Sequence, residues 1–293
     1  MRDRIEAPAG GAGGAAARRS LAHAAESLVR AGAGASTQWE GASLTTHFQP
    51  IYRVRRPECF GFEALMRAKD AQGGSVFPED VFARTAESAR SLLDWTCRAL
   101  HLRNYATVDP GDRMLFINVD PAAIVRDAHQ ARELGDLIRY YGLVPKRVCL
   151  EVLEAPCPDE RKLRDAVDSY RALGVCIAMD DFGVGCSNFD RVVALRPDLV
   201  KVDRSMLSAA LGNDRVRRML PGMIDLLHQA QVKVVVEGIE SREAALLAIK
   251  ARADFLQGYY FAMPGARLAG EGPGIERLGR ILDIAGGATL AAA

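Results

Sequence analysis

Short apolar runs rich in β-branched and aromatic residues recur along the chain from Leu44 onwards. Alternation of apolar and polar positions within such runs is typical of β-strands, and glycine, proline and polar clusters separate them. Eight strands are therefore predicted. They are Leu44–Arg53, Cys59–Arg67, Met114–Val119, Val148–Leu153, Val175–Asp180, Leu199–Asp203, Val232–Glu237 and Phe255–Phe261.

Helical spacing of apolar residues fills most of the intervals between these runs. Leu134, Leu137, Ile138 and Tyr141 follow the i, i+3, i+4, i+7 pattern of one helix face. A second stripe joins Leu163 to Tyr170 through Val167, and Pro78 with two following acids is suited to a first helical turn. Further helices are predicted over Asn188–Leu195, Asp214–Ala230, Ser241–Arg252 and Ile275–Ile284.

Strands that alternate with helices predict an α/β fold, a modified TIM (β/α)₈ barrel. Only residues 54–58 separate the first two strands. A parallel crossover needs about a dozen residues or more, so the first strand is predicted to run antiparallel to the second. A doubly wound open sheet is the alternative, although no GxGxxG turn supports a dinucleotide-binding version.

The first forty residues differ in composition from the rest of the chain and are interpreted as an N-terminal extension. Gly10, Gly11, Gly13 and Gly14 lie among alanines, and no aromatic residue precedes Trp39. A flexible Gly/Ala-rich segment is expected, with a short, weakly amphipathic helix possible over Ala16–Arg30. Residues 41–293 are assigned to the barrel domain.

Composition excludes several classes of protein. The 293 residues carry 38 basic and 37 acidic side chains, which argues against a general DNA-binding protein. No apolar run reaches the roughly 18 residues of a membrane span. The six cysteines form no CxxC pair, and no secretory leader is recognisable, so a reducing cytoplasm is expected. Cys186 is a candidate redox-sensitive thiol, with an ordinary loop cysteine as the alternative.

Polar residues collect at the carboxyl ends of the predicted strands. In a barrel these ends meet at one mouth, where active sites lie. The residues placed there are Glu63, Asn118, Glu151, Asp180, Asp181, Lys201, Glu237 and Gln257. So many carboxylates at close range require cations, and oxygen ligands suit Mg²⁺ or Mn²⁺. The pattern predicts a two-metal site for phosphate-ester hydrolysis, with Lys201 orienting water or neutralising charge. Taken singly, Asp181 and Asp203 could instead be caps of helices or turns.

Six short motifs in register resemble one known family. They are Gln49–Tyr52, Phe62–Arg67, Asp180–Gly185, Pro197–Asp203, Glu237–Glu240 and Gln257–Tyr259, followed by Pro264. From about Leu44 to Pro264 the chain strongly resembles the EAL-domain family of bacterial cyclic di-GMP phosphodiesterases. The resemblance implies a barrel with an antiparallel first strand, and hydrolysis of cyclic di-GMP to linear pGpG in second-messenger signalling. It also implies dependence on Mg²⁺ or Mn²⁺ with two ions per site, inhibition by Ca²⁺, and a homodimer.

The resemblance further implies a role for each motif residue. The expected metal ligands are Glu63, Asn118, Glu151, Asp180, Asp181 and Glu237. The expected catalytic residues are Glu237 as general base, Lys201 as holder of the catalytic water, and Glu63. Substrate contacts are expected from Gln49, Leu65, Arg67, Asp203 and Gln257, with Glu240 in support. Glu154, Phe182 and Gly183 are expected to couple the loop after Asp181 to the dimer interface.

Departures from the family pattern define the alternatives. Leu153 and Val184 stand where threonines are usual, and Cys186 and Asn188 also differ, so loop order or dimer coupling is expected to differ. A catalytically weak or inactive receptor for cyclic di-GMP is therefore the second hypothesis. A protein-interaction module acting through the extension or a barrel helix is the third.

Overall fold

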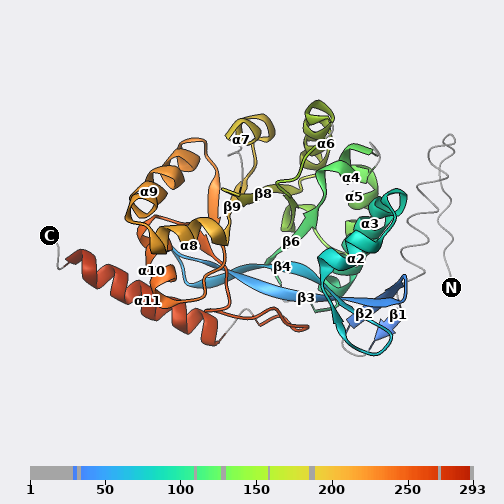
Figure 1. Cartoon of the computed structure of the whole chain (residues 1–293), viewed down its shortest axis with the longest axis horizontal. Helices are drawn as coiled ribbons and strands as arrows, with labels where there is room; N and C mark the ends of the chain where they lie inside the picture. The colour runs from blue at the N-terminus through green and yellow to red at the C-terminus, as the bar shows by residue number, and fades with distance from the viewer. Residues whose placement is uncertain are drawn as a thin grey trace.

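The computed structural model describes residues 29–31, 34–108, 111–126, 130–157, 159–184, 189–269 and 272–290. Its centre is a closed eight-stranded barrel (Figure 1). The barrel strands are β3 (Ala42–Arg53), β4 (Glu58–Lys69), β6 (Met114–Val119), β7 (Val148–Val152), β8 (Cys176–Phe182), β9 (Leu199–Val202), β10 (Lys233–Val236) and β11 (Phe255–Leu256). The predicted modified TIM barrel is confirmed.

The first barrel strand, β3, runs against all its neighbours. It pairs antiparallel with β4 on one side and with β11 on the other, whereas the remaining barrel neighbours are parallel. The short link over residues 54–58 therefore makes the antiparallel turn that the sequence predicts. Pairing of β3 with both β4 and β11 closes the barrel.

The barrel interior consists of two layers that follow from side-chain alternation. The lower layer is an apolar floor that includes Ile51, Phe116, Leu199, Val235 and Phe255. Two residues further towards the mouth, each strand or the residue directly after it points a polar side chain inwards, because residues i and i+2 share a face. These eight residues are Gln49, Glu63, Asn118, Glu151, Asp180, Lys201, Glu237 and Gln257.

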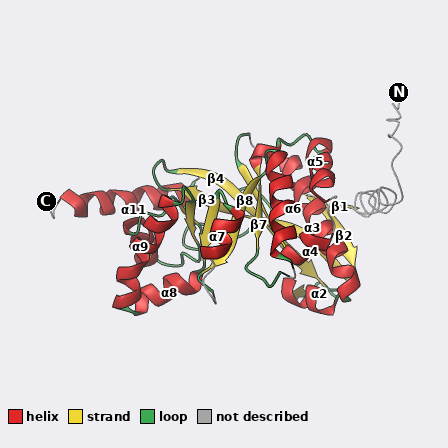
Figure 2. Ribbon diagram, turned by 90° about the horizontal axis from the view of Figure 1, so that it is seen from above, coloured by secondary structure: helices red, strands yellow, loops and turns green. Residues whose placement is uncertain are grey.

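Helices cover the outside of the barrel (Figure 2). They are α2 (Pro78–Arg84), α3 (Glu87–Val108), α4 (Pro121–Arg126), α5 (Gln130–Tyr140), α6 (Glu160–Ala172), α7 (Phe189–Leu195), α8 (Arg204–Gly212), α9 (Asp214–Gln229), α10 (Arg242–Lys250) and α11 (Pro273–Leu290), with the 3₁₀ helix η1 (Pro145–Arg147). On α6 the predicted stripe from Leu163 to Tyr170 is buried, and the Asp159 side chain caps the first turn. No helix in the described part of the chain has the length and apolar character needed to cross a membrane.

One predicted strand is too long, and one long helix is absent from the prediction. The last strand is predicted to reach Phe261 but ends at Leu256. The chain turns there because Gly258 packs against Ile239, where an added Cβ would lie 2.2 Å from the Ile239 carbonyl oxygen. The long helix α3 has no clear apolar stripe in the sequence, because its buried face also carries polar residues such as Asp94, Arg98 and His101.

Strands also replace part of the predicted extension. The possible helix over Ala16–Arg30 lies outside the described residues up to residue 28, and Val29 and Arg30 belong to β1 (Val29–Ala31), not to a helix. β1 pairs with β2 (Gly34–Trp39), which pairs with β3. The Asn104 side chain of α3 accepts from the Ala35 N–H at 2.5 Å and donates to the Ala35 carbonyl at 2.9 Å. Residues 34–39 are therefore part of the folded sheet, as is the two-residue β5 (Ser75–Val76) at its other end.

The loop that leads into β11 is held by Asp254. Its carboxylate accepts hydrogen bonds from the Val234 N–H at 3.0 Å, from Lys233 at 3.0 Å and from His228 at 2.8 Å. Burial alone would raise the Asp254 pKa, but these hydrogen bonds outweigh it and leave the pKa below its usual value.

Candidate active site

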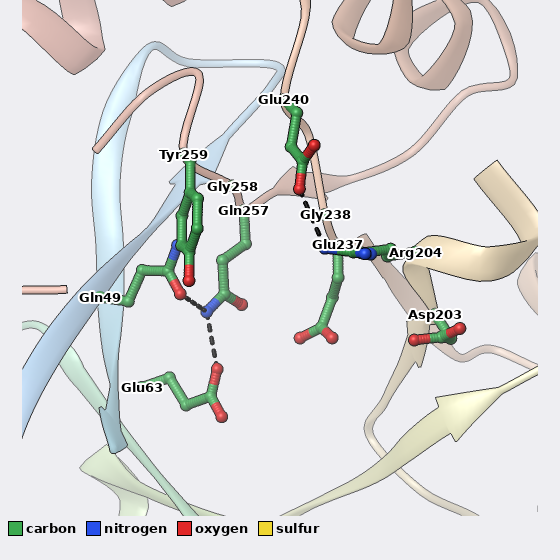
Figure 3. Close-up of a pocket in the computed structure, with 10 residues that line it drawn as sticks. All are labelled: Gln49, Glu63, Asp203, Arg204, Glu237, Gly238, Glu240, Gln257, Gly258 and Tyr259. Atoms are coloured by element: carbon green, nitrogen blue, oxygen red, sulfur yellow. Dashed lines mark hydrogen bonds and ion pairs between the residues drawn. The ribbon is translucent and has the colours of Figure 1, made fainter. Parts of the chain in front are cut away.

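A polar pocket opens at the carboxyl ends of the barrel strands. It has a volume of about 190 Å³ (Figure 3). The residues that line it are Gln49, Glu63, Asp203, Arg204, Glu237, Gly238, Glu240, Gln257, Gly258 and Tyr259. They come from β3, β4 and the segments that follow β9, β10 and β11, which are far apart in sequence. The pocket lies above the apolar floor, so a ligand bound in it would face the polar layer.

Lys201 lies at the centre of the polar layer and contacts four carboxylates. Its Nζ is 2.6 Å from Glu237 Oε1 and 2.8 Å from Glu151 Oε1. It is 3.2 Å from Asp180 Oδ1 and 3.4 Å from Glu63 Oε2. The Lys201 side chain is only 1% exposed, so water screens these interactions weakly. One ammonium thus faces four acids, and the cluster has an excess of negative charge when all are ionised.

The pKa values of these groups reflect both their burial and the excess of negative charge. Burial raises the pKa of Glu151 well above its usual value and that of Glu237 to about 8, although Lys201 opposes both shifts. Burial lowers the pKa of Lys201, but the four surrounding carboxylates more than reverse this and hold it well above its usual value. A divalent cation bound among the carboxylates would favour their ionised forms and displace their protons.

Three amides complete the polar layer around Glu63. Gln257 donates to Glu63 Oε2 at 2.6 Å and to Gln49 Oε1 at 3.3 Å, and Asn118 donates to Glu63 Oε1 at 2.8 Å. Burial acts to raise the Glu63 pKa, yet Lys201 and these hydrogen bonds bring it below its usual value. Glu63 is therefore the most firmly ionised of the four acids.

The donor set fits a hard divalent cation. Ligand oxygens of Glu63, Glu151 and Asp180 lie within 4.8 Å of one another. Asn118 Oδ1 and Glu151 Oε2 are buried and have no hydrogen-bond partner among the described residues. Buried polar atoms are rarely left unpaired, so these oxygens are suited to metal ligation. Carboxylate and amide oxygens match the preferences of Mg²⁺, Mn²⁺ and Ca²⁺.

A bulge in β8 presents Asp181 next to Asp180. The register against β9 shifts between Met179 and Phe182, and Asp181 adopts a left-handed φ of 55°. Non-glycine residues seldom adopt this conformation, which is enriched at functional sites. Burial and the neighbouring Asp180, Asp203 and Glu154 charges raise the Asp181 pKa to about 6. Asp181 is thus placed beside the cluster and outside the set that contacts Lys201.

The remaining predicted residues fall into three groups. Phe182 is buried and packs edge-on against Phe189 with ring centroids 5.2 Å apart, and Gly183 has a φ of 103°. Leu65 and Arg67 follow Glu63 on β4 but lie outside the pocket lining, and Arg67 donates to the Met66 carbonyl at 2.8 Å. Residues 185–188, which include Cys186 and Asn188, lie outside the described residues.

Sequence reasoning gave no role to four pocket residues, Arg204, Gly238, Gly258 and Tyr259. Arg204 follows Asp203 directly, and Tyr259 follows the Gln257-Gly258 pair, so both adjoin residues that the motifs did identify. Gly238 has a φ of 63°, and an added Cβ would lie 2.1 Å from the Arg204 Cβ. The sequence feature that could have identified Gly238 is its position directly after the predicted site residue Glu237.

Comparison with known proteins gives a consistent result. The family model described as EAL domain matches residues 35–264. The probable cyclic di-GMP phosphodiesterase PdeD of Escherichia coli K12 is 31% identical over 226 residues, which are 74% of this chain and 40% of PdeD. An uncharacterised protein of Azorhizobium caulinodans is 31% identical over 76% of this chain and 32% of its own length. The chain thus spans well under half of these relatives.

Solved structures show the same similarity. A standalone EAL protein from Vibrio cholerae O395, in a c-di-GMP bound form, superposes with a TM-score of 0.71 at 28% identity over 80% of this chain and 97% of its own. The Klebsiella pneumoniae protein BlrP1, in a complex with calcium and cyclic di-GMP, gives a TM-score of 0.69 at 25% identity over 76% of this chain and 56% of its own. A manganese complex of BlrP1 is similar to the same degree, with a TM-score of 0.70 at 25% identity over 80% of this chain and 59% of its own.

Proposed function

The chain belongs to the EAL domain family, and from this premise we propose that it hydrolyses cyclic di-GMP to linear pGpG in bacterial second-messenger signalling. The observation that carries the proposal is the complete polar layer, in which each of the eight barrel strands, or the residue directly after it, supplies one polar side chain to the mouth. A protein that only bound the nucleotide would not need four carboxylates around one lysine.

Each residue of the layer has a role in the proposed reaction. Glu63, Asn118, Glu151, Asp180 and Glu237 would hold one divalent ion, and Asp181 would hold a second. Bound Mg²⁺ or Mn²⁺ would polarise the scissile phosphodiester and favour deprotonation of the attacking water. The unpaired oxygens of Asn118 and Glu151 support this ligand set. The larger Ca²⁺ ion would fill the site without supporting turnover.

The chain's own groups then position water and move its proton. Lys201 holds the attacking water and neutralises charge that develops on the phosphate oxygens. Glu237 lines the pocket and lies 2.6 Å from Lys201, so it is placed to accept the proton of that water. Gln257 and Gln49 fix Glu63, and Leu65 and Arg67 contact substrate above the pocket. Hydrolysis breaks one P–O bond and leaves a 5′-phosphate on pGpG.

Two further proposals concern the surroundings of the site. Glu154, Phe182 and Gly183 couple the loop after Asp181, and with it the pocket, to a homodimer interface. The cytoplasm is the proposed compartment; the five described cysteines form no disulfide with one another, which is in keeping with a reducing environment.

The test is incubation of the purified chain with cyclic di-GMP and Mg²⁺, Mn²⁺, Ca²⁺ or EDTA, with products separated by chromatography. pGpG should form with Mg²⁺ or Mn²⁺ only. Glu63→Ala should abolish the reaction, and Glu79→Ala, an exposed acid on α2, should not change it. Normal turnover by Glu63→Ala would show that the assigned site is wrong. Tight nucleotide binding without turnover in either metal would favour the receptor function.

A further inference from the structure

The opposite end of the barrel carries a second and larger hollow that the proposed reaction does not use. It is an open groove of about 950 Å³, formed where β4 begins and where the chain enters β6 and β7. Phe60 and Met114 of its lining also belong to or pack against the apolar floor. The floor therefore separates this hollow, which we call the lower groove, from the pocket at the mouth.

Positive charge exceeds negative charge in the described lining of the lower groove. Its basic side chains come from segments that are far apart in sequence, and they are Arg53, Arg113, Lys146 and Arg147. Of the three acids in the described lining, Glu58 is paired with Arg53 at 2.9 Å and Glu276 with Arg280 at 3.6 Å. The other three basic side chains are therefore opposed by one described acid, Asp112, and the groove attracts anions.

Two of these basic side chains, those of Arg113 and Arg147, are only partly exposed and are held by the fold. Arg147 Nε donates to the Arg113 carbonyl at 3.3 Å, and the Tyr105 hydroxyl donates to the same carbonyl at 2.9 Å. The Arg113 guanidinium lies 5.8 Å from the centroid of the Phe62 ring. Because these contacts already restrict both side chains, binding an anion would cost little further side-chain entropy.

Another part of the lining is apolar and includes Phe60, Met114 and Ile275. Phe60 stacks on Phe255 with ring centroids 4.2 Å apart, so its ring is firmly supported. Phosphate oxygens match the guanidinium and ammonium groups, but a simple inorganic anion would leave the apolar groups in water. A ligand that joins phosphates to a planar, largely apolar body would satisfy both parts of the lining.

We propose that the lower groove binds a mononucleotide, with its phosphates against Arg113, Lys146 and Arg147 and its base against the apolar part. This site does not rest on the proposed hydrolysis, because the groove and the pocket at the mouth share no lining residue. The two are nevertheless connected, since β4 supplies Phe60 to the groove and Glu63 to the mouth. A nucleotide bound in the groove would therefore contact a strand of the active site.

The test is isothermal titration calorimetry of the full chain with ADP in EDTA, which removes divalent ions from the inner carboxylates. ADP should bind, and its two halves, pyrophosphate and adenosine, should each bind weaker on the order of 10-fold or more, because linked contacts reinforce each other. Lys146→Glu should weaken ADP binding roughly 10- to 100-fold, since it replaces a charge-assisted contact by repulsion. Lys250→Glu, at an exposed position on α10 outside both hollows, is the matched control. Glu63→Ala should bind ADP as the unmodified chain does.

Several results would overturn the inference. Unchanged affinity in Lys146→Glu, or an equal loss in Lys250→Glu, would show that ADP does not use the lower groove. Loss of ADP binding in Glu63→Ala would place the ligand at the mouth, and pyrophosphate binding as tight as that of ADP would exclude a base contact. Failure of the proposed hydrolysis is distinguishable from all of these, because it would leave ADP binding and its dependence on Lys146 intact.

Discussion

Replacing Lys201 by methionine keeps most of the side-chain volume and removes the only ammonium among four buried carboxylates. In the variant these acids face one another without a counter-charge from Lys201. They must either repel one another or take up protons. The substitution therefore tests the electrostatic account of the site separately from catalysis.

The size of the effect follows from burial. Removing one partner of a buried ion pair costs about 3–5 kcal/mol, because an uncompensated charge remains inside the protein. At about 2–4 °C per kcal/mol for a domain of this size, the midpoint of unfolding should fall by roughly 6–20 °C. Burial raises the pKa values of Glu151, Asp180 and Glu237, and Lys201 opposes these shifts; without Lys201 the folded state is therefore expected to bind more protons than the unfolded chain. Its stability consequently falls as pH rises, and the loss is larger at pH 8 than at pH 5.

Thermal unfolding followed by circular dichroism in EDTA, at both pH values, measures this loss. Adding Mn²⁺ should raise the midpoint more in K201M than in the unmodified chain, because the ion supplies the missing positive charge. Lys250→Met, at an exposed position on α10, is the control. Equal midpoints for K201M and the unmodified chain at pH 8, or a difference that does not depend on pH, would refute the reasoning.

Three other substitutions address the scaffold. Asn104→Ala should cost about 2–4 kcal/mol in urea unfolding, because it leaves the buried N–H and C=O of Ala35 without their partner; an unchanged midpoint would contradict the role given to this side chain. Asp254→Asn should destabilise by about 1.5–3 kcal/mol at neutral pH. Because the Asp254 pKa is lowered on folding, this difference should persist above the unfolded value and shrink as pH falls through the folded one; a difference that stays constant in acid would count against it. Gly258→Ala places a Cβ 2.2 Å from a backbone oxygen and should reduce hydrolysis by displacing Gln257, whereas Gly279→Ala, with no atom within 4 Å of the added Cβ, should not.

The barrel could be predicted because short apolar runs, most of them buried on both faces, recur between helical patterns. Met114–Val119 was predicted residue for residue, since its buried run has clear polar boundaries on both sides. The polar residues at the mouth could be predicted from the same runs. Glu151 and Lys201 interrupt otherwise apolar strands, two residues beyond the floor residues Cys149 and Leu199. The antiparallel β3 followed from the length of a single loop.

Other features depend on contacts between distant segments. The strands β1 and β2 carry little apolar signal, and β2 is held in place by the Asn104 side chain, which no local pattern predicts. α3 was not predicted from the sequence, because polar residues such as Arg98 and His101 are buried on the helix and interrupt its apolar pattern. The position of Arg204 at the pocket depends on Gly238 lying against it, and that approach is a property of the closed barrel.

The antiparallel β3 has a consequence for how the chain folds. Its pairing with β4 is local, but its other edge pairs with β11, and Gln49 and Gln257 meet across 208 positions of sequence. Such high contact order makes closure a late and slow event. During synthesis on the ribosome, β10 lacks its outer neighbour until β11 emerges, and an unpaired strand edge is open to association with other chains. The last strand therefore completes the polar layer and also ends the interval in which the nascent barrel is most exposed to misassembly.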